Sequence, residues 1–598
     1  MPGLVGLVTR MPHELAEAEL LRMVAALRHE ITYVSGTWCE ESLGLYVGWV
    51  ERGGPFANCM PVHNEKRDLV LTFSGEDFCK RGHANGFEDP SYLAQLAEED
   101  SSFPKGLNGR FHGVLADRRK GTVTLFNDRY GMHRIYYHEA NGVFYFAAEA
   151  KAILAIRPEL RSIDPDGLAE FVSCGCTLKN RTLFKDIRVL PPASAWTFQQ
   201  ATIRRKAGYF DAKEWEEQSL LEPELYYRQL REVFSKNLPR YFDGPKRVGV
   251  SLTGGLDTRM IMSWCKAAPG TLPCYSFGGM FHDSEDVVIA RRVARACGQE
   301  HEVISVGGEF LDRFAHYSER AVFLTDGCVD VKHSADLYVN ERAAEIAPVR
   351  MTGNYGGEVL RRVRAFKPVD PVPGLFHSSF STYIERARET YSGLLEGHPL
   401  SFAVFRQAPW HHYGLLSLEQ SQLSLRSPFL DNDFVKTVFR APSSALASDD
   451  ISLRLIEDGN PALSKIRTDR GLGGSLPAWA AAMRRAYLEF TFKAEYAYDY
   501  GMPQTLARVD HALAPLHLER AFLGRHKFNH YRIWYRDALG SYIREMLLDP
   551  RTLARPYLQR DTLEGIVREH LAGRRNYTTA IHKILTLEHL HRLFVDSI

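Results

Sequence analysis

The first 205 residues carry short runs of β-prone residues at close spacing. Each run is rich in Val, Leu, Phe or Tyr, and turn-forming pairs such as Asn127-Asp128 and Asn141-Gly142 lie between runs. A second ladder over residues 193–203 closes the region. The pattern predicts a layered antiparallel domain. The predicted strands cover residues 5–8, 43–49, 69–73, 122–126 and 143–147.

From residue 246 onward, single strands alternate with helices. Residues 247–252 have the composition of a buried strand, and a glycine-containing loop and a helix from about Arg259 follow. Because parallel strands need helical crossovers, this alternation predicts a doubly wound parallel sheet. The next predicted elements are a strand over 272–277, a helix over 284–297 and a strand over 301–306.

The segments on either side of the predicted sheet are helical. Residues 206–245 are rich in Glu and Tyr and are predicted to form a helical connector. Residues 449–598 show helical periodicity with interleaved Tyr, Trp and Arg. We therefore predict an α/β protein in three parts, over residues 1–205, 206–245 and 246–598.

Composition and charge exclude several classes of protein. The chain has 74 Lys plus Arg and 73 Asp plus Glu, which argues against nucleic-acid binding through bulk charge. No apolar stretch approaches the ~18 residues of a membrane span, and the first ten residues lack the basic segment of a signal peptide. Nine cysteines without a C-x-x-C pair indicate reduced thiols. We therefore expect a cytoplasmic protein that binds neither nucleic acid nor membrane.

The segment S-L-T-G-G-L-D-T-R over residues 251–259 carries the clearest chemistry. It follows the first predicted strand, at the end where open α/β sheets bind ligands. Gly254 and Gly255 let backbone N–H groups approach an anion, and the helix N-terminus behind them favours negative charge. Asp257 beside a phosphate implies a cation, for which we expect Mg²⁺. The residues predicted to bind phosphate are Ser251, Thr253, Gly254, Gly255, Asp257 and Thr258.

Strand, loop and helix together resemble the PP-loop ATP pyrophosphatases, and specifically the glutamine-hydrolysing asparagine synthetase family. That family's loop reads S-G-G-L-D-S, so Thr253 and Thr258 stand in for its serines. Further similar segments follow in the family's order. They are Tyr275-Ser276-Phe277-Gly278, a helix beginning at Asp286, Arg426-Ser427-Pro428-Phe429-Leu430-Asp431 and, in the first part, residues 107–111, 128–131 and 148–152.

The resemblance implies a fold and a set of cofactors. It implies an N-terminal Ntn-hydrolase-like αββα domain of glutamine amidotransferase type over 1–205. It also implies a doubly wound, parallel-sheet PP-loop synthetase domain over 246–598 with a helical C-terminal part. ATP and Mg²⁺ are the implied cofactors, with the adenine received at the second strand near Phe277.

The N-terminus departs from the family pattern. The family's glutaminase uses a Cys at position 2, whose thiol attacks the glutamine amide. Here that position holds Pro2, which has no thiol, and Ser74-Gly75-Glu76 keeps only part of the family's glutamine-holding N-G-E. The resemblance therefore implies an amidotransferase-like domain that has lost its glutaminase activity.

The loop over residues 351–360, M-T-G-N-Y-G-G-E-V-L, departs as well, because the family has S-G-D-G-x-D-E here. Without gaps, the family's metal-binding Asp falls on Gly357 and the following Glu on Glu358. With one inserted residue, Tyr355-Gly356-Gly357-Glu358 resembles the Y-G-S-D of β-lactam synthetases. Either alignment leaves Glu358 as the second expected Mg²⁺ ligand beside Asp257. The resemblance places Tyr355 near the nucleophile and Thr352 and Gly353 at the pyrophosphate.

Glu358 also has a purely structural interpretation. As a structural acid it would pair with Arg361 or Arg362, which follow it at helical spacing.

A third departure lies in residues 463–474, L-S-K-I-R-T-D-R-G-L-G-G. Relatives carry a Lys near this point that stabilises charge during adenylation and amide formation. Arg470 is nearest in register, whereas Lys465 is the lysine of this segment, so both are candidates for that catalytic role. Either cation would stabilise negative charge on the α-phosphate and pyrophosphate. A solvated basic loop is the alternative.

These observations predict an ATP-dependent, AMP-forming amide ligase. It would adenylate a small-molecule or peptide carboxylate, release pyrophosphate, and transfer the acyl group to an amine or ammonia from a source other than glutamine. β-Lactam and lasso-peptide macrolactam synthetases share the missing Cys. The alternatives are a glutamine-hydrolysing asparagine synthase and a nucleotide-binding pseudoenzyme. The substrates are left open, as is assembly into a homodimer.

Overall fold

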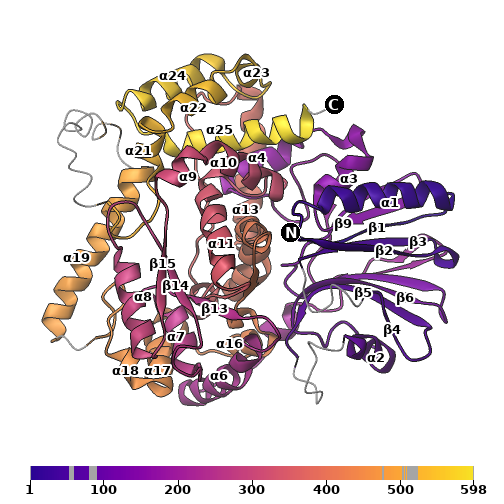
Figure 1. Ribbon diagram of the computed structural model, residues 1–598, viewed down its shortest axis with the longest axis horizontal. Helices are drawn as coiled ribbons and strands as arrows, with labels where there is room; N and C mark the ends of the chain where they lie inside the picture. The colour runs from indigo at the N-terminus through magenta and orange to yellow at the C-terminus, as the bar shows by residue number, and fades with distance from the viewer. Residues whose placement is uncertain are drawn as a thin grey trace.

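The structure is a computed structural model that describes residues 2–52, 60–79, 90–474, 477–501, 504, 507 and 523–596. Every structural statement below concerns these residues. Figure 1 shows two parts side by side. The N-terminal residues form a layered, β-rich part, and the remaining residues form a larger part in which helices surround a further sheet. Among the described helices, none combines the length and the apolar character that a membrane span requires.

Two antiparallel six-stranded sheets form the N-terminal part. Figure 1 shows helices α1 and α3 over the first sheet and α2 beneath the second, so the layers run α, β, β, α. The first sheet has the order β10-β8-β9-β1-β3-β2 and the second β12-β11-β7-β6-β5-β4. The strands of the first sheet are β1 Gly3–Val8, β2 Val34–Glu40, β3 Leu45–Glu51, β8 Tyr136–Ala140, β9 Val143–Ala147 and β10 Arg188–Val189. Those of the second are β4 Val62–His63, β5 Leu69–Asp77, β6 Gly109–Asp117, β7 Thr122–Asn127, β11 Ala195–Gln199 and β12 Thr202–Arg205.

Strand β1 shows how the layers are held together. Its side chains alternate between the two faces of the sheet, as the period of a strand requires. Leu4 and Val8 enter the core between the two sheets, whereas Val5 and Leu7 pack in the core that contains the buried side chains of α1. The predicted αββα architecture is confirmed. The helices are α1 His13–Leu27, α2 Ser91–Glu99, α3 Ala150–Ile156 and α4 Pro165–Cys174.

The predicted ladder over 193–203 is in fact a hairpin. Strands β11 and β12 pair antiparallel, with Gln199 opposite Thr202. The two residues between them, Gln200 and Ala201, have φ of 52° and 57°. Two consecutive left-handed residues are the geometry of a tight two-residue hairpin turn. Neither residue is a glycine, which explains why the turn was not predicted from the sequence.

A five-stranded sheet with the order β15-β14-β13-β16-β17 organises the second part, and all its strand pairs are parallel. The chain starts at the central strand β13 and adds β14 and β15 on one side, then β16 and β17 on the other. The strand order therefore reverses between β13 and β16, where open α/β sheets bind their ligands. The strands are β13 Val248–Ser251, β14 Cys274–Gly278, β15 His301–Ser305, β16 Val349–Met351 and β17 Ser424–Arg426.

Helices connect and cover this parallel sheet, as the alternating pattern predicts. The first begins at Asp257 rather than at Arg259, so Asp257 and Thr258 belong to the helix and not to the loop before it. The helices up to the last strand are α5 Lys213–Glu216, α6 Pro223–Asn237, α7 Asp257–Trp264, α8 Glu285–Ala296, α9 Gly308–Asp312, α10 Phe314–Leu324, α11 Ser334–Ile346, α12 Gly356–Arg361, α13 Ser378–Leu394, α14 Pro399–Phe402 and α15 Tyr413–Gln420.

After the last strand, the described chain is helical, as predicted. Figure 1 shows this region wrapping around the outer side of the second part, with α19 extending from its edge. The helices are α16 Asn432–Val438, α17 Asp450–Gly459, α18 Pro461–Ser464, α19 Ala478–Tyr496, α21 Tyr531–Arg536, α22 Gly540–Leu547, α23 Pro550–Leu553, α24 Arg560–Leu571 and α25 Thr578–Leu590.

Candidate functional site

A cavity of about 320 Å³ opens at the carboxyl ends of β13 and β16, at the point where the strand order reverses. Eight of the residues predicted from the sequence line it: Ser251, Thr253, Asp257, Thr258, Thr352, Gly353, Tyr355 and Glu358. Six further lining residues were not predicted: Arg350, Asn354, His412, Leu415, Leu416 and Glu419. The two glycine-containing loops that the sequence singled out therefore form opposite walls of one cavity.

Two threonines hold the first loop in shape. The hydroxyl oxygens of Thr253 and Thr258 lie 3.1 Å apart, and the Thr253 N–H donates to Thr258 Oγ1 at 3.3 Å. On the other side, the Gly254 N–H donates to Asp286 Oδ1 at 2.5 Å. These bonds leave the loop curved around the start of α7, where the first N–H groups of a helix have no intrahelical partner.

The second loop passes directly over the first. A Cβ atom on Gly353 would lie 2.8 Å from the Thr258 nitrogen, and one on Gly356 would lie 2.7 Å from Asp257 Oδ1. Real Cβ atoms do not approach other atoms so closely, so glycine is required at both positions. Gly353 and Gly356 thus allow the second loop to pack closely against Asp257 and Thr258 of α7.

Asp257 faces the cavity but already has a cationic partner. Nη2 of Arg361 lies 2.8 Å from Oδ1 and 2.9 Å from Oδ2 of Asp257, and Nη1 donates to Ser452 Oγ at 3.0 Å. Arg361 belongs to α12, which begins in the second loop. Burial raises the pKa of Asp257 to about 6, and Arg361 opposes that shift. Both carboxylate oxygens are thus engaged by one guanidinium group.

Glu358, the second predicted metal ligand, pairs with a histidine. Nε2 of His412 lies 3.2 Å from Oε1 of Glu358. Burial opposes ionisation of Glu358, but the neighbouring His412 holds the pKa of the carboxyl below its ordinary value. Arg361, one of the two partners that the structural interpretation of Glu358 names, pairs with Asp257. His412 precedes α15, far along the chain, so sequence spacing could not indicate this pair.

Tyr355 lines the same cavity as these two carboxylates. It is buried, its φ is 73°, and its ring lies 5.8 Å from the ring of His412 in an edge-to-face arrangement. A left-handed backbone is uncommon for a bulky residue and costs free energy. The strained position aims the tyrosine at the cavity, where it had been predicted.

Arg350 is the cationic residue of this wall that sequence reasoning missed. It lies in the three-residue strand β16 and is buried, and its Nη1 donates to Glu419 Oε1 at 2.8 Å and to Asn340 Oδ1 at 2.9 Å. Its guanidinium carbon lies 5.0 Å from the centre of the Phe277 ring. Phe277 therefore borders the site through Arg350 and does not line the cavity itself. An arginine within a buried strand was the signal that could have identified the residue.

The third predicted segment, residues 463–474, packs against the phosphate loop. The buried Arg259 donates to the Gly254 oxygen at 3.1 Å, to the Arg467 oxygen at 3.0 Å and to the Ile466 oxygen. The Asp469 N–H donates to the Gly254 oxygen at 3.1 Å. This segment therefore holds the loop in place through hydrogen bonds to the Gly254 oxygen and to Arg259.

Neither predicted cation of that segment lines the phosphate cavity. Arg470 lies 2.6 Å from Glu489, and its guanidinium carbon lies 3.1 Å from the centre of the Phe492 ring. Lys465 lines a separate cavity of about 250 Å³. The structure therefore brings Tyr355 to the site but leaves Lys465 and Arg470 outside it.

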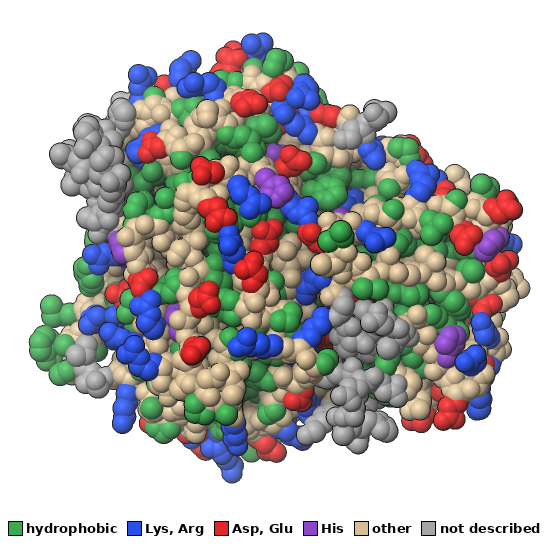
Figure 2. Space-filling model, in the orientation of Figure 1, with side chains coloured by type: hydrophobic (Ala, Val, Ile, Leu, Met, Phe, Trp, Pro, Cys, Tyr) green, Lys and Arg blue, Asp and Glu red, His purple; other side chains and the backbone are tan. Residues whose placement is uncertain are grey.

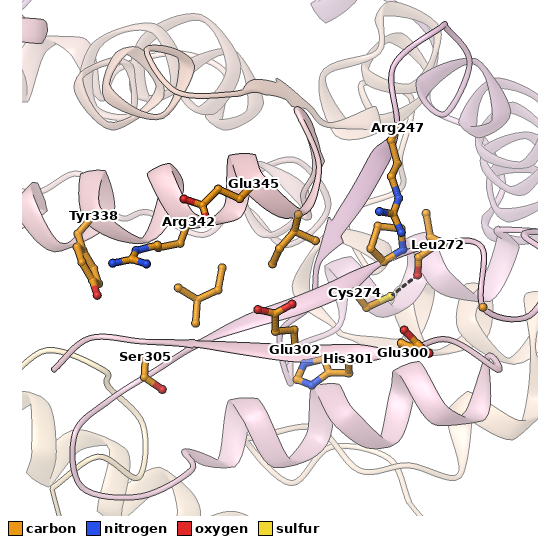
Figure 3. Close-up of a pocket in the computed structure, with 14 residues that line it drawn as sticks. Arg247, Leu272, Cys274, Glu300, His301, Glu302, Ser305, Tyr338, Arg342 and Glu345 are labelled. Atoms are coloured by element: carbon orange, nitrogen blue, oxygen red, sulfur yellow. Dashed lines mark hydrogen bonds between the residues drawn. The ribbon is translucent and has the colours of Figure 1, made fainter. Parts of the chain in front are cut away.

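A larger cavity, of about 970 Å³, lies along the edge strand β15 of the parallel sheet. Figure 3 shows it between β15, with Glu302 and Ser305, and helix α11, with Tyr338, Arg342 and Glu345. Residues before or at the start of the strands, such as Arg247 and Cys274, also line it. Parallel sheets of this type bind ligands beyond the carboxyl ends of their strands, and this cavity holds none of the predicted residues. Size alone therefore does not identify the active site.

The N-terminal part has a third pocket, of only about 80 Å³, where the family resemblance placed glutamine. Pro2 precedes β1 and lines it, and no described cysteine does. Oε1 of Gln420, from the end of α15, accepts from Arg110 Nη1 at 2.6 Å and Nη2 at 3.0 Å. Arg426 of β17 donates to Glu76 Oε1 at 2.6 Å and 2.9 Å.

Comparison with known proteins assigns both parts of the chain. Residues 91–210 match the family described as glutamine amidotransferase domain, and residues 229–363 match the family described as asparagine synthase.

Curated relatives are similar at low identity. Asparagine synthetase [glutamine-hydrolyzing] 1 of Bacillus subtilis (strain 168) is 22% identical over 401 residues, covering 62% of this chain and 61% of that protein. Putative asparagine synthetase [glutamine-hydrolyzing] 1 of Methanocaldococcus jannaschii is 24% identical over 251 residues, covering 39% and 42%. The chain thus spans less than two thirds of the length of either relative. A solved glutamine phosphoribosylpyrophosphate amidotransferase from B. subtilis aligns with a TM-score of 0.25 and 9% identity, over 51% of this chain and 91% of that one.

Proposed function

Because the chain belongs to the asparagine synthetase family, we propose that it is an ATP-dependent ligase that joins a carboxylate to an amine not taken from glutamine in this chain. One observation carries the proposal. A cavity lined by eight of the predicted residues lies at the carboxyl ends of β13 and β16, while the pocket in which the family resemblance placed glutamine is lined by Pro2 and the chain's own Gln420. This contrast supports a retained synthetase reaction and a lost glutaminase reaction.

ATP would enter with its phosphates against the loop that holds Gly254 and Gly255. The first N–H groups of α7 lack a partner within the helix, and they and the hydroxyls of Thr253 and Thr258 are suited to phosphate oxygens. The N–H groups of Gly254 and Gly255 donate to Asp286 and Thr253, and would have to release these acceptors to bind phosphate. A substrate carboxylate oxygen would attack the α-phosphorus and pyrophosphate would leave. An amine would then attack the acyl carbon, AMP would leave, and the amide would form. The residues act by positioning and by stabilising charge.

Two of the three acidic residues that line the cavity, Asp257 and Glu358, are suited to a Mg²⁺ ion, while the third, Glu419, pairs with Arg350. Mg²⁺ is usually held by one or two carboxylates together with phosphate oxygens and water. Asp257 and Glu358 line the same cavity from opposite loops and would hold it. When bound, the ion offsets negative charge on the leaving pyrophosphate. Arg361 would then have to yield one oxygen of Asp257, while its contact with Ser452 keeps it nearby.

The remaining walls support a role in excluding water and in binding a substrate. Leu415 and Leu416 provide an apolar face, and the buried Arg350–Glu419 pair balances charge at the base. Tyr355 lies between this base and the carboxylates, where it would contact the carboxylate or amine substrate. Lys465 and Arg470 lie outside the cavity, so a catalytic role for either requires the segment 463–474 to move.

Two assays on the full chain test the proposal. In the first, binding of ATP with Mg²⁺ is measured by calorimetry for the wild type, for Asp257→Asn and for the control Asp283→Asn, an exposed acid that pairs with Arg291 outside the cavity. We expect the affinity to fall about tenfold or more for Asp257→Asn only. In the second, glutamate release from glutamine is followed with Mg²⁺ and ATP present. Release above the protein-free rate would contradict the proposal.

A further inference from the structure

Three side chains of different chemistry meet at the outer edge of the N-terminal part. His13 is the first residue of α1, Cys39 lies near the end of the edge strand β2, and Glu41 begins the short 3₁₀ turn that follows this strand. One nitrogen of His13, the Cys39 sulfur and one Glu41 oxygen all lie within 4.8 Å of one another. Figure 2 shows acidic and histidine side chains together at the outer edge of the β-rich part, where one end of α1 lies in Figure 1.

The pairing of β2 with β3 determines where the thiol lies. Cys39 is opposite Tyr46, and side chains opposite each other on paired strands lie on the same face of a sheet. Tyr46 is buried in the core that contains the buried side chains of α1, and Cys39 packs against the same core. The ring of Tyr46 lies 5.7 Å from the ring of His13. Sheet and helix therefore hold the thiol beside the imidazole, although the two residues are well separated in the sequence.

The two nitrogens of the His13 ring have different surroundings. Nδ1 lies 3.3 Å from Oε1 of Glu41, is shielded from solvent and makes no hydrogen bond to any described residue. Nε2 lies 3.5 Å from Oε2 of Glu17, which is one helical turn further along α1. A histidine that binds a metal through one nitrogen usually donates the N–H of the other nitrogen to a carboxylate, which fixes the orientation of the ring. Nδ1 is therefore suited to a metal ion, and Nε2 to a supporting bond with Glu17.

The charges around the cluster favour a cation, and the donor atoms select among cations. Within the described part of the chain, neither Glu17 nor Glu41 pairs with a Lys or Arg side chain. The side chain of Glu41 is 64% exposed, so an ion can reach the cluster from solvent. Mg²⁺ and Ca²⁺ are bound by oxygen atoms, whereas thiolate, imidazole and carboxylate together are ligands of Zn²⁺.

We propose that Cys39 Sγ, His13 Nδ1 and a carboxylate oxygen of Glu41 bind a Zn²⁺ ion, with water as the fourth ligand and Glu17 accepting from His13 Nε2. The Cys39 thiol loses its proton to solvent on binding, because the thiolate is the ligand. The three atoms draw together to about 2.0–2.3 Å from the ion through small changes in partly exposed side chains. The ion ties the start of α1 to the edge strand β2 and so stabilises the N-terminal part. This inference does not depend on the proposed reaction.

The test uses the full chain after treatment with a chelator. Zn²⁺ affinity is measured by competition with a chromogenic indicator, and Co²⁺ is added as a probe because its thiolate complexes absorb in the near ultraviolet. We expect a Co²⁺–thiolate band in the wild type that is lost in Cys39→Ser, and no described cysteine lines the phosphate cavity to give such a band there. The affinity for Zn²⁺ should fall about a hundredfold or more for Cys39→Ser and about tenfold for Glu17→Gln, which changes only the supporting carboxylate. Zn²⁺ should also raise the Tm of the wild type but not that of Cys39→Ser.

Matched controls and a second ligand variant keep the test decisive. Cys79→Ser and His63→Gln change half-buried residues of the same part outside the cluster, and both should bind Zn²⁺ and Co²⁺ as the wild type does. Glu41→Gln changes an exposed ligand and should weaken Zn²⁺ binding even if Cys39→Ser impairs folding. The proposal is overturned if the wild type binds no Zn²⁺, or if Cys39→Ser and Glu41→Gln bind it unchanged. It is also overturned if the Co²⁺–thiolate band survives in Cys39→Ser or is lost in Cys79→Ser, because the metal then lies at another cysteine.

Discussion

Asp257 and Glu358 face one cavity, and each has a nitrogen-containing partner from a different segment of the chain. For Asp257 the partner is the guanidinium group of Arg361, and for Glu358 it is the ring of His412. These partners let two carboxylates remain close together without a ligand, since unpaired buried charges are costly. The pairs also mean that a cation added to the site competes with side chains already there.

Replacing Glu358 by Gln tests its role as a metal ligand. The change keeps the shape of the side chain and removes its charge, so Mg²⁺ loses one of two carboxylates. We expect the Mg²⁺ concentration for half-maximal ATP binding to rise, by roughly tenfold. Calorimetry at several Mg²⁺ concentrations measures this. If the variant's Mg²⁺ dependence matches that of the wild type, Glu358 is a structural partner of His412 only.

Asp286 gives the site a pH dependence of stability. Burial near Asp469 raises the pKa of Asp286 to about 7 from its ordinary value of 3.8. The folded state therefore holds a proton that the unfolded state has lost, and the penalty for ionising it grows as pH rises from about 4 to 7. Asp286→Asn keeps an acceptor for the Gly254 N–H and has no charge to bury. Thermal melts should show the variant gaining Tm relative to the wild type as pH rises through that window. A constant difference from pH 4 to 8 would refute this assignment.

At the scale of elements, the segment 463–474 and the phosphate loop form one unit through Arg259. This buried side chain bonds three backbone oxygens, those of Gly254, Ile466 and Arg467. Arg259 immediately follows the T-G-G-L-D-T motif. The first turn of α7 therefore carries both residues predicted to bind phosphate and the side chain that holds the segment 463–474. The loop's shape thus depends on a segment about two hundred residues away.

Arg259→Met should weaken both stability and nucleotide binding. Methionine fills similar space but leaves the three oxygens without their donor, at a cost of about 2–4 kcal/mol. Urea unfolding measures the loss of stability, and calorimetry the accompanying loss of affinity for ATP. Arg228→Met, on the exposed side of α6, is the matched control. An unchanged ATP affinity in a destabilised Arg259→Met variant would show that the segment does not shape the loop.

Sequence patterns predicted the elements of the parallel sheet well and the pairs inside the site poorly. Alternation of strand and helix is local, so β13, β14, β15 and the helices between them lie within a few residues of their expected positions. The positions of His412, Arg361 and Gln420 depend on helices α12 and α15 packing around the sheet, which no local pattern records. Arg350 was also missed, although a charged residue between Val349 and Met351 is visible in the sequence. Arg470 was chosen by register and Lys465 as the lysine of its segment, and both lie outside the cavity.

At the scale of the whole molecule, Asp431 joins the two parts of the chain. Its buried carboxylate accepts from Asn108 of the N-terminal part at 2.8 Å and from Asn237 of the connector at 2.9 Å. It also caps α16 through the Asp433 and Phe434 N–H groups. The Arg426–Glu76 pair adds a second contact between the two parts, at the pocket that Pro2 lines. We therefore expect the N-terminal part to stabilise the second part.

Asp431→Ala should weaken the coupling between the two parts, so that they unfold at different temperatures. The variant removes the carboxylate to which Asn108, Asn237 and Tyr241 donate and also removes a helix cap, a loss of about 3 kcal/mol or more. In differential scanning calorimetry, we expect unfolding at a lower temperature and in two resolved transitions rather than one. The N-terminal transition should not depend on ATP. A single transition at the wild-type temperature would show that the parts are coupled elsewhere.

The central claim is that the synthetase half activates a carboxylate while the other half no longer supplies ammonia from glutamine. Exchange of labelled pyrophosphate into ATP, run with the full chain, Mg²⁺ and a panel of amino-acid and peptide carboxylates, tests it most directly. Glutamate release is followed in parallel with glutamine as the amine source. The account predicts exchange with at least one carboxylate, lost in Asp257→Asn, and no glutamate release. Pyrophosphate formation that requires glutamine and releases glutamate, or the absence of exchange with every carboxylate, would contradict it.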